Sequence, residues 1–404
     1  MTSAGTWRGQ APVLLASGAA IAGFASIALS HLLLGAAVAW LLVARRELLR
    51  LPPVWLPAAV FLAWTLVSLF ASEDPQAGLP QVRKFYVWLV LVVVFSALRN
   101  AEQVRWLFVA IVAVGTASAV WSMVEFWQKY SHAMQTGKDF YQAYVADRIT
   151  GFMSHWMTFA AQMMMGTLLL ASFVFYDRRG IRWTVVAPAA LLLGLALVLG
   201  FTRSIWPATA AGLLYLVWFW RRWMIVAMIV AAPVLGLVGI LAGPEFVQMR
   251  IRSVWAPDPK LDSNADRVAM RSTGIRMIQA HPVLGVGPEH VERNFVKHMP
   301  DDLAKPPWVG HLHNIYLQFA AERGVPALLA MLWLLGKALV DFRAALRRLR
   351  PEEATRRCVL HAAVACMIGI LVGGWWEHNL GDSEVLASVW TVIAGGYVAV
   401  KEES

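Results

Sequence analysis

The sequence predicts an all-α polytopic membrane protein, and three observations support this prediction. Of the 404 residues, 59% are hydrophobic and only 15% are charged, whereas soluble domains average about 45–50% apolar and about 25% charged residues. The apolar residues form runs of roughly 17–25 residues, which is the length that a helix needs to cross a bilayer. Short clusters of Lys and Arg separate these runs, and the 20 Trp residues fit the aromatic belts of a membrane interface.

About twelve transmembrane helices account for the apolar runs. The stretch 11–43 is too long for one span, so we divide it at residues 26–30. Because Arg8 precedes a long apolar stretch without a convincing cleavage site, we interpret the first run as a span rather than a removed signal peptide. The other predicted spans are 54–71, 85–98, 104–126, 155–175, 183–201, 204–220, 223–242, 324–340, 359–375 and 385–400.

The cationic loops predict the orientation. With twelve spans, all of the Arg-rich short loops fall on one side; these are residues 45–50, 99–105, 178–182, 221–222 and 343–357. The positive-inside rule makes this side cytoplasmic and places both termini there. The excess of 35 Lys and Arg over 25 acidic residues therefore indicates membrane orientation, and we expect no nucleic-acid partner.

The opposite side carries the longest polar segment, so the chain divides into three parts. Residues 1–242 hold nine predicted spans, residues 243–313 form a large loop, and residues 314–404 hold the last three spans. Within the loop, a helix is expected to end at Ala280, before His281-Pro282, and a second short helix is expected at 289–298. Cys358 and Cys366 both fall in one apolar run, so a disulfide framework is not expected.

A candidate for proton transfer lies where the large loop meets the next span. The stretch 308–327 changes from a polar loop flanked by Gly and Pro into a helix that runs into an apolar segment. His311 and His313 stand at this junction, and Asn314 follows them. A lone histidine is more often structural than catalytic. An imidazole at the rim of a membrane, however, is well placed to take a proton from a substrate that arrives from water or lipid.

Three arginines on the same predicted side are candidates for anion binding. Arg203 lies in a tight turn between two apolar segments, where it is either an interfacial anchor or a ligand for phosphate oxygens. Arg267 and Arg271 are four residues apart on one helix face, where an anion would relieve their repulsion; for Arg271 a solvated face is the simpler interpretation. Arg148 is a weaker candidate on the same side.

Several common catalytic signals are absent from the sequence. It has no HExxH motif, no CxxC pair and no GxxxxGK loop, and its aspartates are not spaced convincingly for a metal. We therefore expect no metal, no other cofactor and no use of ATP by this chain.

These features together resemble the O-antigen ligases and the related O-antigen polymerase superfamily of bacterial envelopes. In that family a His and an Asn, Ser or Gln are followed after nine residues by Gly, and three positions later by a second Gly. Here His313 and Asn314 are followed by Gly324, and Ala327 stands where the second Gly is expected. The turn 201–204 is similar to the family's arginine turn, residues 266–288 are similar to its loop signature, and the resemblance covers essentially the whole length.

The resemblance implies a glycosyltransferase of GT-C-like architecture in the bacterial inner membrane, acting in lipopolysaccharide biosynthesis. Its donor would be a glycan on undecaprenyl diphosphate, its acceptor the lipid A–core oligosaccharide, and its active site periplasmic. His313 would be the general base on the acceptor hydroxyl, and Arg203 and Arg267 would bind the diphosphate. Asn314, Arg148 and His311 would contribute further substrate contacts. Direct displacement without metal or ATP predicts inversion at the anomeric carbon.

Three alternatives stay open at this point. An O-antigen polymerase would use the same lipid-linked donor with a growing glycan as acceptor. A flippase or transporter would be expected to carry ionisable residues along its spans and some repeat symmetry, whereas the span interiors here are nearly free of charge. A structural scaffold would not need an arginine at the turn 201–204.

Overall fold

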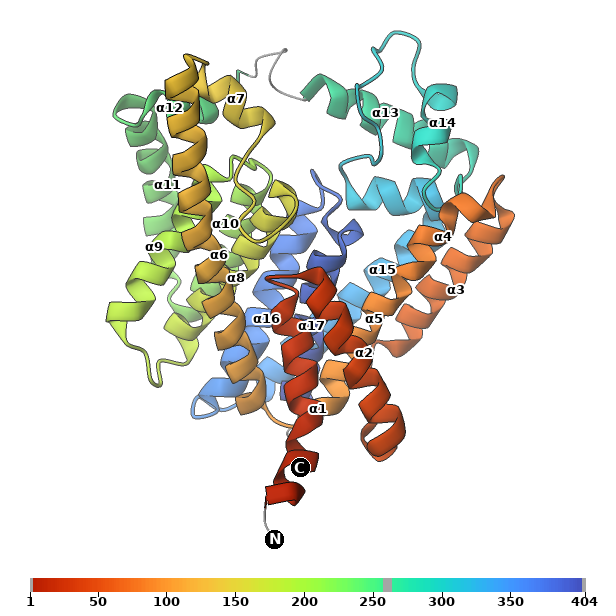
Figure 1. The fold of residues 1–404 in the computed structure, drawn as a ribbon, viewed down its shortest axis with the longest axis vertical. Coiled ribbons are helices and arrows are strands. Elements are labelled where there is room, and N and C mark those ends of the chain that lie inside the picture. Colours follow the sequence, from red (N-terminus) through yellow and green to blue (C-terminus); the bar gives the residue numbers. More distant parts are fainter. Residues whose placement is uncertain (1–2, 257–263, 402–404) are drawn as a thin grey trace.

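The computed structural model describes residues 3–256 and 264–401, and the side chains of residues 10–256 and 266–401. The described residues form helices and no strand (Figure 1), which confirms the predicted all-α fold class. The elements are α1 (Ser3–Ala22), α2 (Ile27–Ala44), η1 (Arg46–Leu48), α3 (Trp55–Ala71), α4 (Pro75–Arg83), α5 (Phe85–Ala97), α6 (Ala101–Thr136), α7 (Phe140–Ala146), α8 (Trp156–Tyr176), α9 (Trp183–Leu199), α10 (Ile205–Trp220), α11 (Trp223–Leu241), α12 (Glu245–Arg252), α13 (Asn264–Ala280), α14 (Val291–His298), α15 (Ile315–Arg348), α16 (Ala354–Gly373), η2 (Asn379–Gly381) and α17 (Ser383–Lys401).

Each predicted span corresponds to an apolar helix of the described chain. Eight helical segments are long and apolar enough to cross a membrane, and four shorter apolar helices, in α1, α3, α9 and α10, accompany them. The protein is therefore a polytopic membrane protein. The first apolar run is divided into two helices, as predicted, but the break lies at residues 23–26 instead of 26–30, since α1 ends at Ala22 and α2 begins at Ile27. Ser26 caps α2 by accepting a hydrogen bond from the backbone N–H of Leu29.

Two segments that lie between predicted spans are helical. Residues 75–83 form α4, and Asp74 caps it by accepting from the N–H groups of Gln76 and Ala77. Helix α6 continues ten residues past the predicted span end at Phe126. No Gly or Pro interrupts residues 116–136, and the helix ends only at Gly137 in a left-handed conformation with φ 65°. At 36 residues, α6 is about 54 Å long and exceeds the roughly 30 Å hydrocarbon core.

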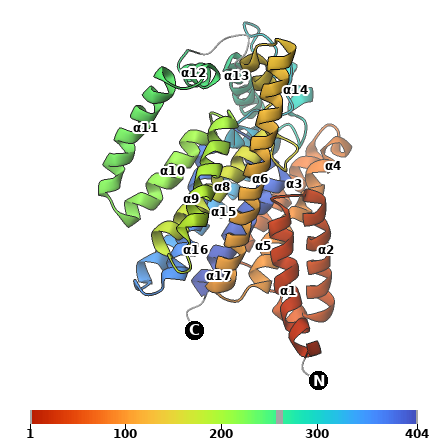
Figure 2. The same ribbon diagram turned by 60° about the vertical axis from the view of Figure 1, so that its left-hand side comes forward.

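Helices α8, α16 and α17 form the centre of the bundle, and most of their residues are buried. By contrast, α11 is packed at the edge (Figure 2) and none of its span is buried within the chain. A helix that is apolar all round and exposed to its surroundings is typical of a lipid-facing span.

The two ends of the bundle differ in character. Helices α7, α12, α13 and α14 gather at one end, whereas the chain begins and ends at the other (Figure 1). At the latter end, Arg105 donates to Asp177 at 3.0 Å and Arg179 donates to the same carboxylate at 2.8 Å, which ties the start of α6 to the end of α8. Thr355, at the start of α16, also donates to Asp177. We call this the basic end, and the opposite one the cavity end.

Helix α15 is kinked where the large loop docks on it. Gly324 interrupts the helix with φ 79°, and a side chain there would overlap the Val283 carbonyl. Around the kink, Val325 N–H donates to the Pro282 carbonyl and Val286 N–H donates to the Ala321 carbonyl, both at 2.8 Å. The two segments that resemble family motifs, around Gly324 and within 281–288, thus hold the loop against the helix that carries the candidate histidine.

Candidate active site

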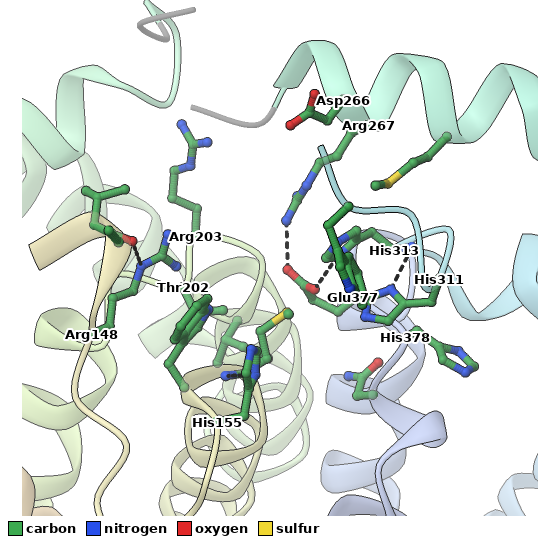
Figure 3. A pocket seen from close by; sticks show the side chains of 18 of the residues that line it. Arg148, His155, Thr202, Arg203, Asp266, Arg267, His311, His313, Glu377 and His378 are labelled. Atoms are coloured by element: carbon green, nitrogen blue, oxygen red, sulfur yellow. Dashed lines mark hydrogen bonds and ion pairs between the residues drawn. The ribbon is translucent and has the colours of Figure 1, made fainter. Parts of the chain in front are cut away.

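A cavity of about 700 Å³ opens at the cavity end of the bundle (Figure 3). It lies between α7, α12 and α13 and the ends of α8, α10 and α16. The structure brings five of the six predicted site residues to its walls, although they come from four separate parts of the chain. These five residues are Arg148, Arg203, Arg267, His311 and His313.

Asn314, the sixth predicted residue, does not line the cavity. Its Oδ1 accepts hydrogen bonds from the N–H groups of Tyr316 and Leu317, both at 2.9 Å, so it caps the N-terminus of α15. Its Nδ2 donates to the Trp375 carbonyl at 2.9 Å. The side chain is therefore fully used in holding the backbone beside His313.

His313 faces a buried carboxylate that sequence reasoning did not single out. Its Nδ1 lies 3.1 Å from Oε2 of Glu377, whose side chain is almost completely buried. His313 also adopts a left-handed backbone with φ 46°, which is rare for a residue other than Gly. Non-glycine residues in such conformations cluster at functional sites, where the surrounding structure holds them.

Glu377 joins three segments of the cavity wall. Its Oε1 accepts a hydrogen bond from Arg267 at 2.8 Å and another from Ser204 Oγ at 2.9 Å. Burial alone would raise the pKa of Glu377, but the Arg267 charge and the hydrogen bond with His313 lower it to about 2. The carboxylate is therefore ionised at neutral pH and orients the imidazole. We call Arg267, His313 and Glu377 the carboxylate wall.

The turn that carries Glu377 is fixed against the segment that carries His313. Ile315 N–H donates to the Gly374 carbonyl at 2.8 Å, next to the Asn314–Trp375 bond described above. A side chain at Gly374 would overlap the Ile315 side chain, so the close approach of α15 and α16 requires Gly there. The spacing between the imidazole and the carboxylate thus depends on backbone contacts and not on the two side chains alone.

The opposite wall holds three arginines, Arg148, Arg203 and Arg250, which we call the arginine wall (Figure 3 shows the first two). Arg250, on α12, is buried and donates to the Phe201 carbonyl at 3.0 Å; Arg148 donates to the same carbonyl at 3.4 Å. Arg203 donates to Ser253 Oγ at 3.1 Å. Burial, together with the charges of Arg250 and Arg203, lowers the pKa of Arg148 to about 9. An anion placed among these cations would relieve their repulsion.

Aromatic packing holds the arginine turn in place. Phe201, with φ 51°, is the second residue of this site other than Gly that has a left-handed backbone. Its buried ring packs against that of Tyr144, with ring centres 5.1 Å apart. Phe140 of α7 packs on Phe246 of α12 with ring centres 5.1 Å apart. Because α7, α12 and the turn form one aromatic cluster, the arginines on them and next to them are held in a fixed relation to one another.

His311 lies beside His313 and supports it. The two rings are 4.2 Å apart, and His311 Nδ1 accepts the backbone N–H of His313 at 3.3 Å. Burial, assisted by His313, lowers the pKa of His311 to about 3. His311 is therefore neutral at physiological pH, and its Nδ1 is occupied in holding the strained loop.

The comparison with known families supports the resemblance noted in the sequence. Residues 188–332 match a family model described as O-antigen ligase. This match supports membership of the O-antigen ligase/polymerase superfamily. No curated protein matches the chain. The O-antigen ligase domain includes Arg203, Arg250, Arg267 and both histidines, whereas Arg148 and Glu377 reach the cavity from outside it.

Some polar groups of the cavity lack partners among the described residues. They are the Nε of Arg267, the Nδ1 of His378 and both amide atoms of Asn379, all of them buried. Buried donors and acceptors usually find a partner, so a ligand that carries hydroxyl and anionic oxygens would satisfy these groups. Asn379 lies in η2, two residues beyond Glu377, and belongs to the same turn.

The described residues form no group of three His, Cys, Asp or Glu side chains suited to a metal. That the protein works without a metal or other cofactor stays a prediction. The groups present in the cavity are those of acid–base chemistry on one wall and of anion binding on the other.

Proposed function

We propose that this protein is an O-antigen ligase that transfers a preassembled glycan from undecaprenyl diphosphate to the lipid A–core oligosaccharide at the periplasmic face of the inner membrane. The observation that supports this most directly is the pairing of His313 with the buried Glu377, opposite an arginine wall in one cavity. Members of this superfamily are glycosyltransferase-like enzymes of O-antigen processing.

His313 is the general base in this proposal. With its Nδ1–H donated to Glu377, the ring keeps Nε2 for the proton of the acceptor hydroxyl. The ionised carboxylate stabilises the imidazolium that forms, as a buried aspartate does in a serine-protease triad. The acceptor oxygen then forms a bond to the anomeric carbon while the bond from that carbon to the diphosphate oxygen breaks.

The arginines bind the diphosphate and stabilise the charge that grows as it leaves. Guanidinium groups bind phosphate oxygens in a bidentate fork, and Arg203 and Arg267 line the cavity from opposite walls. Fixed cations of this kind take the place that a metal has in other glycosyl transfers. The diphosphate is itself a good leaving group, so the reaction needs no ATP. A single displacement inverts the anomeric centre.

The other parts of the substrates have matching surroundings. The unpartnered amide of Asn379 suits sugar hydroxyls, and the exposed ring of Trp308, at the mouth of the cavity, offers a stacking face. The polyprenyl chain would lie between spans below the cavity.

The proposed orientation places the basic end in the cytoplasm and the cavity in the periplasm. It rests on the Arg-rich loops, which the sequence puts on the side opposite the cavity residues. A single cysteine at exposed Gln135 should react with an impermeant thiol reagent in spheroplasts, and one at exposed Glu352 should not. Both native cysteines are buried and give a low background. The reverse labelling pattern would invert the orientation.

A transfer assay tests the function itself. Purified protein is incubated with radiolabelled lipid-linked glycan, with and without lipid A–core and in the presence of EDTA. We expect label to move to lipid A–core only, undiminished by EDTA and absent in His313→Ala. Lengthening of the lipid-linked glycan without added acceptor would show a polymerase instead, and inhibition by EDTA would contradict a metal-free reaction. Retention at the anomeric carbon of the product would exclude a single displacement.

A further inference from the structure

A second cavity lies at the basic end of the molecule and takes no part in the proposed transfer. It has a volume of about 330 Å³ and lies between α10, α15 and α16. It lies towards the opposite end of the bundle from the active site. His361, one of its residues, lies twelve positions before Gly373, where α16 ends at the cavity end, and twelve residues span about 18 Å of helix.

Three arginines form the cationic side of this second cavity. They are Arg343 and Arg347 from α15 and Arg357 from α16. None of the three forms an ion pair within the described part of the chain. Two acids near them in sequence are engaged elsewhere: Asp341 pairs with Lys337 at 2.8 Å, and Glu353 pairs with Arg356 at 2.5 Å. The arginines therefore present positive charge that the described protein does not neutralise.

The rest of the second cavity is mainly apolar and includes one buried polar pair. Leu339, Val364 and Ile368 line it from α15 and α16. On α16, between Arg357 and Val364, the Nδ1 of the buried His361 lies 3.0 Å from the hydroxyl of Tyr215. The same ring stacks on Tyr176 with centres 4.0 Å apart, which fixes its position. Charge at the rim and hydrocarbon inside is the arrangement that suits an amphiphile with an anionic head.

We propose that this second cavity binds an anionic glycerophospholipid of the bilayer. The phosphate would lie among Arg343, Arg347 and Arg357, and an acyl chain would follow the apolar lining along α15 and α16. Basic pockets between transmembrane helices are known to hold phospholipid headgroups. The exposed Trp218 and Trp223 mark the interface level at this end of α10 and α11. A free phosphate would use the arginines but not the apolar lining, so the lining favours a lipid.

The experiment measures phosphatidylglycerol bound to the purified full-length protein in detergent, by native mass spectrometry during a titration. Phosphatidylethanolamine and inorganic phosphate are the competing probes. The test variant is Arg343→Gln/Arg347→Gln. Its matched control is Arg348→Gln/Arg350→Gln, which removes the same charge from exposed positions of the same segment outside the cavity. Leu339→Trp fills the cavity without a change of charge.

We expect phosphatidylglycerol to bind in preference to phosphatidylethanolamine. The Arg343→Gln/Arg347→Gln and Leu339→Trp variants should each weaken it by about tenfold or more, while the control variant keeps the original affinity. Equal weakening in the test and control variants would show diffuse attraction to the basic end and overturn the proposal. Displacement of the lipid by an equal concentration of inorganic phosphate would overturn it in favour of a free-anion site. Unfolding temperatures of all variants verify that each one folds.

Discussion

The two walls of the active-site cavity are built in opposite ways. On the carboxylate wall, Glu377 connects to Arg267, His313 and Ser204 by side-chain hydrogen bonds. On the arginine wall, Arg148 and Arg250 donate to one backbone carbonyl, that of Phe201. The first wall contains a fixed negative charge, and the second concentrates positive charge.

The two walls are therefore suited to different parts of the reaction. A carboxylate held at low pKa next to an imidazole can stabilise a positive ring, which is what proton transfer requires. Several arginines gathered on one wall suit a ligand with many anionic oxygens, which is what a diphosphate offers. Substitutions on the carboxylate wall should therefore change the rate of transfer, and substitutions on the arginine wall should change the affinity for donor.

The largest effect is expected for His313→Ala. Without the base, the acceptor hydroxyl must lose its proton unaided, so kcat should fall by about a thousandfold or more. The Kd for lipid-linked donor should stay nearly unchanged because the arginines remain. Single-turnover transfer and donor titration measure the two quantities separately.

His281→Ala serves as the control, since His281 is an exposed histidine of the same loop outside the cavity. It should transfer at the original rate. Full activity in His313→Ala would move the base to another residue, and loss of activity in both variants would point to a general effect on the loop.

Glu377→Gln should have the next largest effect on rate. The amide keeps the shape of the side chain but cannot stabilise an imidazolium, so kcat should fall by about a hundredfold or more. Loss of the negative charge beside Arg267 should leave donor affinity equal or higher. A weaker donor affinity with unchanged kcat would assign Glu377 to binding instead of to positioning His313.

The same carboxylate predicts a pH dependence of stability. Its pKa is lowered from 4.5 to about 2, so its ionised form stabilises the folded state above about pH 4.5, and this contribution is lost as the pH falls towards 2. The difference in unfolding temperature between the parent protein and Glu377→Gln should therefore be largest above pH 4.5 and shrink below it. A difference that is constant from pH 6 to pH 3 would contradict this assignment.

The arginine wall should respond in affinity and by a smaller factor. Arg203→Lys keeps the positive charge but loses the bidentate hydrogen bonds that a guanidinium group forms with phosphate. The donor Kd should therefore rise by about tenfold, with little change in kcat. Arg148→Lys should behave in the same way, and Arg267→Lys should affect both quantities because Arg267 also bonds Glu377. Arg271→Lys is the matched control on the exposed face of α13. An affinity loss in the control equal to that of Arg203→Lys would mean that net charge alone attracts the donor.

Much of the architecture could be predicted from the sequence because lipid imposes a simple rule on length and composition. Apolar runs of span length became helices, and Ser26 and Gly137 mark element ends as their chemistry predicts. The His313 and Arg203 positions could be found because polar residues at the ends of apolar runs are conspicuous. The helical extension of α6 was missed because its last residues are polar and aromatic and carry no span signal.

Glu377 and Arg250 could not be found in the same way. Glu377 is a single acid in a short loop, and its three partners lie 64, 110 and 173 positions away along the chain. Arg250 lies on a short helix with Arg252 in its last turn, which suggests a solvated face; its burial depends on the aromatic cluster around Phe201. Such contacts arise from tertiary packing, and no local spacing encodes them. The Trp375–Trp376–Glu377 sequence between two spans was the one signal available for Glu377.

The smallest effect is expected for Asn314, which the sequence suggested as a substrate ligand and the structure uses as a cap. Asn314→Ser keeps an oxygen for the N-terminus of α15 and loses the bond to Trp375, so it should destabilise the fold by about 1 kcal/mol. Asn314→Ala loses both contacts and should cost about 1 kcal/mol more. Donor Kd should be the same in both variants, because the side chain does not reach the cavity. Unfolding temperatures and donor titrations measure the two effects. A tenfold loss of donor affinity without a change in unfolding temperature would show that Asn314 binds the donor and belongs with the residues of the carboxylate wall.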